Sequence, residues 1–166
     1  NLLEIVNNIL EISRLESGTE KVIETEYSIG KIMKTLQKSV NERLYNKKVE
    51  FDLDVQETLP ATFLGDEGKV TKIIQNLLSN AINYTEVGKI MCTITGKSNG
   101  IYEKLLIKIT DTGYGIKEED QAKIFEKFVR LEDAKINEIE GVGLGLVITK
   151  KYVELLRGKI WFESQY

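Results

Sequence analysis

Apolar and polar residues recur at two spacings along the chain, and each spacing predicts one kind of element. Apolar residues three and four positions apart predict amphipathic helices. Five segments share this spacing: 1–18, 29–47, 67–84, about 117–128 and about 145–157. Alternating or short apolar runs, which are typical of strands and extended segments, occur at 21–28, 49–55, 61–66, 89–98, 102–110 and 159–164.

The order of these elements indicates the fold class. Gly18 is placed to end the first helix, and Asn99-Gly100 to turn the chain between 89–98 and 102–110. The residues expected on the inner face of the second helix are Ile29, Ile32, Met33, Leu36, Val40 and Leu44. Because helices and strands do not alternate steadily, we expect an α+β fold, a two-layer α/β sandwich whose mixed sheet is covered by helices on one face.

Composition excludes several classes of function. The 166 residues suffice for one domain with a short appendage, and a net charge of −3 argues against a nucleic-acid-binding surface. The absence of histidine excludes catalytic triads, histidine zinc sites and histidine acid–base chemistry within the chain. The single cysteine, Cys92, is expected to be buried and reduced, which fits a cytoplasmic protein. No apolar run is long enough to span a membrane, and no signal pattern is present.

The predicted helix at 67–84 carries asparagines in an unusual place. Asn76, Asn80 and Asn83 fall on one flank of the apolar stripe, within an arc of about 60° at about 100° per residue. Asparagine is a mediocre helix former, so three on one flank need an explanation. They could form a polar boundary that faces water, or a row of amides directed into a cleft. In a cleft, their oxygens could coordinate Mg²⁺ and their NH₂ groups could donate to phosphate.

Two glycine segments are further candidates. The sequence GVGLGL places Gly141, Gly143 and Gly145 before a helix, where the backbone could approach an anion, although flexibility alone would also explain them. The segment fits neither a dinucleotide fingerprint nor a P-loop. The charged residues 129–140 before it have the composition of a mobile lid.

In the second segment, ITDTGYGI, Asp111 shares the parity of Leu105, Ile107 and Ile109, which predicts that it points to the covered face. It could be a turn residue, a metal ligand, a reader of a nucleobase or half of a proteolytic pair of aspartates. The many predicted helices argue against an aspartic protease.

Together, these motifs resemble a known family. NLLSNAINYT, DTGYGI, FEKF and GVGLGL are similar, in this order, to the asparagine, first glycine, phenylalanine and second glycine boxes of sensor histidine kinases. Their ATP-binding catalytic domain belongs to a superfamily that includes DNA gyrase, heat-shock chaperones and mismatch-repair ATPases. NNILEISRLESG resembles the second helix of the dimerisation and phosphotransfer domain. The resemblance therefore implies part of that domain at 1–18 and the catalytic domain at 19–166, without its final strand.

The resemblance also implies a role for each motif residue in binding ATP and Mg²⁺. Asn80 would hold Mg²⁺, with Asn76 and Asn83 near the phosphates and Tyr84 near the ribose and base. Asp111 would accept the adenine amine, and Phe125 and Phe128 would anchor the lid. The other residues placed at the nucleotide are Gly113, Gly115, Ile116, Arg130, Gly141, Gly143, Leu144, Gly145 and Leu146. None of them is assigned a catalytic step.

The hydrolysing relatives carry a glutamate where this chain has Asn76, so the resemblance favours a kinase over an ATPase or chaperone. Asn83 replaces the usual Lys or His, Val142 replaces Thr or Ser, and the acceptor histidine is missing. The implied partners are a second copy bound through the first helix, a histidine outside this chain and the receiver domain of a response regulator. Contact of this chain with nucleic acid or a membrane is not expected. Whether the parent protein is membrane-anchored stays open.

Overall fold

The chain folds into two compact units. The computed structural model describes residues 2–98, 100, 103–129 and 142–166. One unit, here called the helical unit, comprises Asn1–Ile23, Gly68–Asn76 and Gly115–Tyr166. The other, the sheet unit, comprises Glu24–Glu67 and Leu77–Tyr114.

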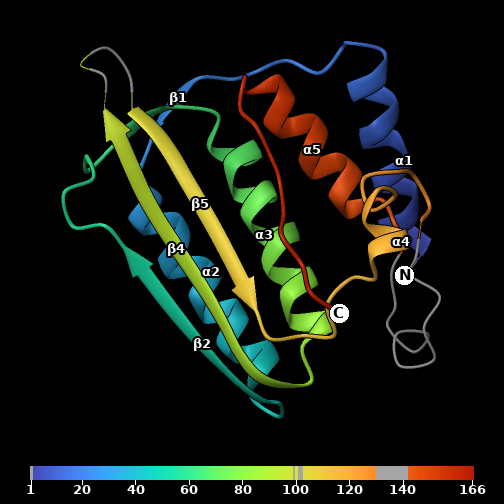
Figure 1. Cartoon of the computed structure of the whole chain (residues 1–166). Helices are drawn as coiled ribbons and strands as arrows, with labels where there is room; N and C mark the ends of the chain where they lie inside the picture. The colour runs from blue at the N-terminus through green and yellow to red at the C-terminus, as the bar shows by residue number, and fades with distance from the viewer. Residues whose placement is uncertain (1, 99, 101–102, 130–141) are drawn as a thin grey trace. The chain divides into compact units, whose positions relative to one another are not determined.

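The sheet unit contains the predicted mixed sheet. Strands β2 (Lys48–Val55), β4 (Val87–Ser98) and β5 (Glu103–Asp111) are hydrogen-bonded in the order β2-β4-β5, as Figure 1 shows. β2 is parallel to β4, and β4 is antiparallel to β5. Two short strands, β1 (Thr25–Tyr27) and β3 (Phe63–Gly65), pair separately and antiparallel. The mixed sheet of the predicted α+β fold is confirmed.

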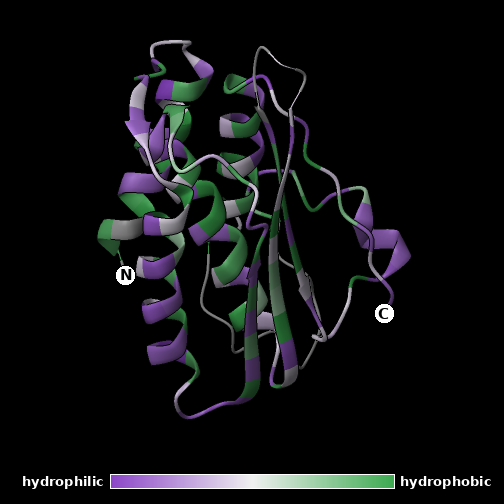
Figure 2. Ribbon diagram, turned by 90° about the vertical axis from the view of Figure 1, so that its left-hand side faces the viewer, coloured by the Kyte–Doolittle hydropathy of each residue, from purple (hydrophilic) through white to green (hydrophobic). Residues whose placement is uncertain are grey.

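Helix α2 (Ile29–Leu44) supplies the core of this unit. Ser28 caps its N-terminus, because the Ser28 Oγ accepts a hydrogen bond from the Lys31 N–H at 3.4 Å. All six residues predicted for the inner face are buried. In β4, Ile90, Cys92 and Ile94 are fully buried, whereas the intervening Met91 is 38% exposed. Figure 2 shows that hydrophobic and hydrophilic segments both occur along the strands. One face of the sheet is therefore the covered one.

The helical unit contains α1 (Leu2–Glu16), α4 (Glu118–Gln121) and α5 (Gly145–Leu155). α1 packs against α5 and ends as predicted before Gly18, whose φ is +67°. Ile12 of α1 is buried. Other apolar residues of this helix are exposed: Leu2, Leu3, Val6, Ile9 and Leu10.

Helix α3 (Glu67–Tyr84) has the predicted bounds and contributes residues to both units. Its apolar stripe is buried at Ile73, Ile74, Leu78, Ala81 and Ile82. The asparagine flank predicted from the sequence therefore lies beside a confirmed core face.

Two predicted elements differ from the structure. The helix at 117–128 is shorter, because after Gln121 the backbone forms tight turns, such as Lys123 N–H to Asp120 C=O at 3.0 Å. There the Phe125 ring packs on Phe162, with 6.0 Å between centroids, and this tertiary contact overrides the helical spacing.

The predicted strand at 159–164 is also absent. Its side chains alternate between half-buried and exposed, but the described residues form no ladder hydrogen bonds with it. Alternation reports the side-chain period and not the presence of a partner strand, so the pattern alone could not decide this point.

Candidate functional site

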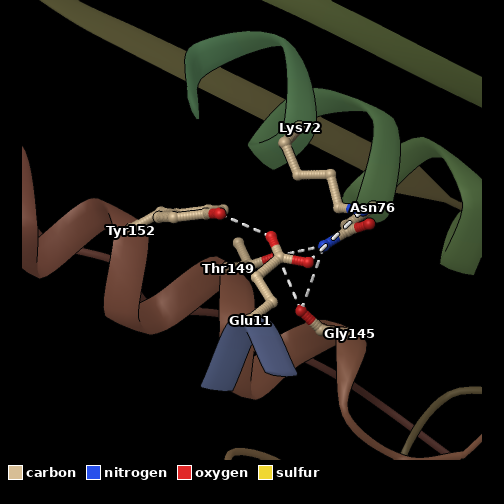
Figure 3. Close-up of polar contacts among 6 residues, drawn as sticks. All are labelled: Glu11, Lys72, Asn76, Gly145, Thr149 and Tyr152. Atoms are coloured by element: carbon tan, nitrogen blue, oxygen red, sulfur yellow. Dashed lines mark hydrogen bonds and ion pairs between the residues drawn. The ribbon is translucent and has the colours of Figure 1, made fainter. Parts of the chain in front are cut away.

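The three asparagines of α3 are all half-buried, but they have different neighbours. Asn76 donates from Nδ2 to the Gly145 carbonyl oxygen and to the Thr149 Oγ1, each at 3.3 Å. The Thr149 hydroxyl donates in turn to the same Gly145 oxygen at 2.9 Å. Figure 3 shows this group with the Asn76 amide oxygen pointing away from α5. Asn76 therefore ties α3 to the first turn of α5.

Asn80 has no hydrogen bond from its side chain to any residue that the structure describes. A half-buried amide without a partner has an oxygen available to a ligand, and amide oxygens suit hard cations such as Mg²⁺. The described residues contain no group of three His, Cys, Asp or Glu side chains that could hold a metal. The assignment of Mg²⁺ to Asn80 stays a prediction from the sequence, with the Asn80 amide oxygen as the group that would hold the ion.

Asn83 lies beside a cation of the sheet unit. Its Oδ1 accepts a hydrogen bond from Arg43 Nη2 at 2.9 Å, and Arg43 Nη1 donates to the Ser79 Oγ at 3.1 Å. Arg43 belongs to α2, so it braces two helices of the same unit. Arg43 could not be found from the sequence, because a charged residue on the exposed face of a helix carries no distinguishing pattern.

The turn after β5 is docked on the C-terminal end of α3. Asp111 Oδ1 accepts a hydrogen bond from the Gly113 N–H at 2.9 Å, and the Tyr114 N–H donates to the Tyr84 carbonyl oxygen at 3.2 Å. A Cβ at Gly113 would collide with that Tyr84 oxygen. Glycine is thus required here for a close backbone approach. The Asp111 side chain is exposed, whereas its strand parity predicted the covered face.

Gly115 and Ile116 follow in the helical unit. Gly115 has a φ of +71°, and a Cβ there would collide with the carbonyl oxygen of Gln165. The Ile116 N–H donates to the Ser164 Oγ at 2.9 Å. Gly115 therefore lies close to the C-terminal segment in this structure, and its placement at the nucleotide stays a prediction from the sequence.

The start of α5 has the features of an anion site. Leu144 is its N-cap and is almost fully buried, yet no side chain of the described residues caps the helix N-terminus. Free N–H groups at such a position attract phosphate. A Cβ at Gly145 would meet nothing within 4 Å, so the backbone there is open. The next residue, Leu146, is half-buried.

Gly143 and Phe128 lie against each other before α5. Gly143 has a φ of +72°, and a Cβ there would lie 2.6 Å from the Val129 carbonyl oxygen. The Phe128 N–H donates to the Gly143 carbonyl oxygen at 3.2 Å, and the Phe128 side chain is exposed. Arg130, Gly141 and all of the lid predicted at 129–140 except Val129 lie outside the described residues.

Polar contacts also join α1 to the other helices of its unit. Glu11 accepts a hydrogen bond from the Tyr152 hydroxyl and pairs with Lys72 of α3 at 3.7 Å, as Figure 3 shows. Glu16 pairs with Lys127, and the hydrogen bond from Lys127 lowers the pKa of the Glu16 carboxyl. The sequence analysis predicted none of these contacts, because they depend on which helix faces lie together.

Comparisons with known proteins agree with the motifs. Residues 65–166 match the family described as histidine kinase-, DNA gyrase B-, and HSP90-like ATPase. The autoinducer 2 sensor kinase/phosphatase LuxQ of Vibrio cholerae is 32% identical over 100% of this chain and 19% of its own length. The histidine-protein kinase BarA of Escherichia coli K12 is 34% identical over 99% of this chain and 18% of its own length.

A solved structure is similar in fold. The crystal structure of full-length ShkA in complex with AMPPNP has a TM-score of 0.79 and 28% sequence identity, and the match covers 94% of this chain and 31% of that one. The chain belongs to the histidine kinase-, DNA gyrase B-, and HSP90-like ATPase family. Within it, the chain is an ATP-binding catalytic domain of the sensor histidine kinase type. It spans less than a fifth of the length of the two curated relatives.

Proposed function

We propose that this domain binds ATP with Mg²⁺ and presents the γ-phosphoryl group to a histidine outside this chain, for relay to an aspartate of a response regulator. The observation that carries the proposal is the half-buried amide of Asn80 in the sheet unit, which has no hydrogen-bond partner among the described residues. In the helical unit, taken by itself, no described side chain caps the N-terminus of α5. An amide oxygen suits the metal, and free N–H groups suit the phosphates.

The remaining residues have positioning roles. Asp111 accepts the adenine amine, and Gly113 keeps its turn against α3. The residues Tyr84, Gly115 and Ile116 border the base and ribose, and Gly143, Leu144 and Leu146 border the phosphates. As the resemblance implies, Phe125 and Phe128 would anchor the lid and Arg130 would reach the phosphates. Gly141 would cradle the triphosphate together with Gly143 and Gly145.

Transfer to another acceptor is favoured over hydrolysis. One helical turn before Asn80, the chain has Asn76, whose NH₂ group is engaged by Gly145 and Thr149. An amide cannot act as a general base toward water, so no side chain at this position would activate it. The chain also has no histidine, so it is expected to accept no phosphoryl group on histidine itself.

The test is calorimetric titration with AMPPNP in the presence and absence of Mg²⁺. We expect Mg²⁺-dependent binding by the natural chain, no detectable binding by Asp111→Asn or Asp111→Ala, and loss of the Mg²⁺ dependence in Asn80→Ala. Glu118→Gln, an acidic residue of α4 outside the site, is the control and should bind normally. Absence of Mg²⁺-dependent binding by the natural chain would refute the proposal.

Two assays separate the kinase from the alternatives. Sustained phosphate release from ATP by this chain would favour an ATPase or chaperone, and the appearance of a labelled residue in it would contradict the need for an outside acceptor. Phosphotransfer is tested by adding a histidine-bearing dimerisation domain and a receiver domain to the labelled mixture.

We further propose that the parent protein is a homodimer through α1 and that this domain works in the cytoplasm. Support comes from the exposed apolar residues of α1 and from the buried free thiol of Cys92. No helix among the described residues has the length and apolarity needed to cross a membrane. Equilibrium sedimentation of a longer protein, with and without Val6→Glu, tests dimerisation, and a monomeric unsubstituted protein would contradict it.

A further inference from the structure

Thr149 is a fully buried polar residue of α5 that none of the motifs includes. It lies one helical turn after Gly145, and its hydroxyl both donates to the Gly145 carbonyl oxygen and accepts from Asn76. We infer that Thr149 is a positioning residue for nucleotide binding, which fixes the Asn76 amide and the first turn of α5. This inference rests on the proposed binding of ATP and Mg²⁺.

The hydrogen bonds determine which end of the Asn76 amide faces α5. The Gly145 carbonyl oxygen can only accept, so the amide atom 3.3 Å from it must be the NH₂ nitrogen. The Thr149 hydroxyl has one proton, which it gives to Gly145 at 2.9 Å, so it can only accept from Asn76. Both neighbours therefore require the same orientation.

The orientation decides what Asn76 offers to a ligand. With its NH₂ group engaged, Asn76 presents only its Oδ1, and no donor among the described residues reaches that oxygen. An oxygen is suited to a cation or its bound water, and it would repel a phosphate oxygen. Asn76 thus serves the Mg²⁺ side of the site as an acceptor, and its NH₂ group is not available for the donation to phosphate considered for the asparagine flank.

The Gly145 carbonyl has a matching role. It receives both the Asn76 and Thr149 hydrogen bonds, so the first turn of α5 is held from two sides. That turn carries the uncapped N–H groups proposed for the phosphates. Without the Thr149 hydroxyl, Asn76 would keep a single weak bond and the amide could rotate.

The experiment compares Thr149→Val, which removes the hydroxyl at nearly constant volume, with Thr149→Ser, which retains it. AMPPNP binding is titrated at several Mg²⁺ concentrations. Thr149→Val should weaken Mg²⁺-dependent binding about three- to tenfold, as expected for one buried hydrogen bond, and raise the half-saturating Mg²⁺ concentration. Thr149→Ser should restore both, and binding of adenosine without Mg²⁺ should be unchanged in either variant.

A second readout uses the nucleotide-free protein. The side-chain NH₂ resonances of Asn76 should be protected from hydrogen exchange in the natural chain and in Thr149→Ser, and exposed in Thr149→Val. Thr85→Val is the matched control for stability, because Thr85 is also fully buried but its Oγ1 has no hydrogen-bond partner in the described part of the chain. It should leave the Asn76 resonances unchanged and should not lower the melting temperature.

The outcomes separate the inference from the proposed function. If the natural chain binds no AMPPNP, the proposed function fails, while protected Asn76 resonances that Thr149→Val abolishes would still support the amide orientation. If the natural chain binds and Thr149→Val has the same Mg²⁺ dependence, the inference fails and the function stands. Equal loss of Mg²⁺-free adenosine binding in Thr149→Val would also overturn the inference, because it would indicate a general structural role.

Discussion

The two glycine segments are held in different ways. At the turn after β5, Gly113 is pressed against the Tyr84 carbonyl oxygen, and the turn is closed by the backbone hydrogen bond from Tyr114 to Tyr84. At the start of α5, Gly145 has open space around its Cα, and side chains, Asn76 and Thr149, hold its carbonyl oxygen. The first glycine is required by the fold itself, whereas the second is available to a ligand.

This difference predicts different consequences of the same substitution. A methyl group at Gly113 meets backbone, which cannot move without disturbing α3. A methyl group at Gly145 meets none of the described residues within 4 Å, so we expect it to matter where a phosphate approaches the helix N-terminus. Stability and nucleotide affinity should therefore fall together at Gly113, whereas only nucleotide affinity should fall at Gly145.

The largest effect is expected for Gly113→Ala. Its Cβ would collide with the Tyr84 carbonyl oxygen, so the free energy of unfolding should fall by about 2–4 kcal/mol, and AMPPNP binding should be lost with it. Chemical denaturation measures the change. Gly30→Ala is the control, because a Cβ there would meet only Ser28 Oγ at 3.7 Å, and it should be neutral or slightly stabilising. A fully stable Gly113→Ala would show that the turn is not locked by its backbone.

Gly145→Ala comes next. Its melting temperature should be equal to or above that of the natural chain, because alanine favours a helix more than glycine does. AMPPNP affinity should nevertheless fall about tenfold, since the methyl group obstructs close approach of a phosphate to the backbone. Adenosine affinity should not change. Unaltered AMPPNP binding would mean that Gly145 does not contact the phosphates. The contrast between a glycine required by the fold and a glycine available to a ligand would then be wrong for Gly145.

The same contrast explains how much the sequence could predict. Side-chain periodicity predicted α2 and α3 well, because each buries one face that is continuous in sequence, from Ile29 to Leu44 in α2. Periodicity predicted a helix at 117–128 that is longer than α4, and a strand at 159–164 that is absent. Both outcomes depend on residues distant in the sequence, because Phe162 packs on Phe125 after α4 and a strand needs a hydrogen-bonded neighbour. The motifs identified the glycines and asparagines as candidate site residues. They did not identify Thr149 or Arg43, because both are ordinary residues for a helix.

A smaller effect is expected for Arg43→Gln, which tests the contact between Arg43 and Asn83 in the sheet unit. The substitution removes the guanidinium that holds Asn83 and Ser79, at an exposed site. The free energy of unfolding should fall by about 0.5–1 kcal/mol, and AMPPNP affinity about twofold if the orientation of Asn83 matters to the phosphates. Lys38→Gln removes the same charge from the exposed face of α2 and is the control. If both substitutions have equal effects, Arg43 acts through its charge alone and not through its hydrogen bonds to Asn83 and Ser79.

The smallest effect concerns Cys92, which pairs with Ile109 on β5 and so lies in the sheet behind the Asp111 turn. Burial raises the pKa of its thiol from 9.0 to about 11. The thiol of the folded state therefore stays protonated to a higher pH than the thiol of the unfolded state. The free energy of unfolding is thus unaffected by this group below about pH 9 and declines as the pH rises toward 11. At pH 9 the loss relative to Cys92→Val should be about 0.4 kcal/mol.

Alkylation at pH 8 should be slow in the natural chain and much faster in Gly113→Ala, because opening of the turn would loosen β5. If the thiol of the natural chain reacts as fast as a free cysteine, the sheet next to the turn is not rigid. The backbone contact between Gly113 and Tyr84 would then not suffice to explain the geometry of the turn.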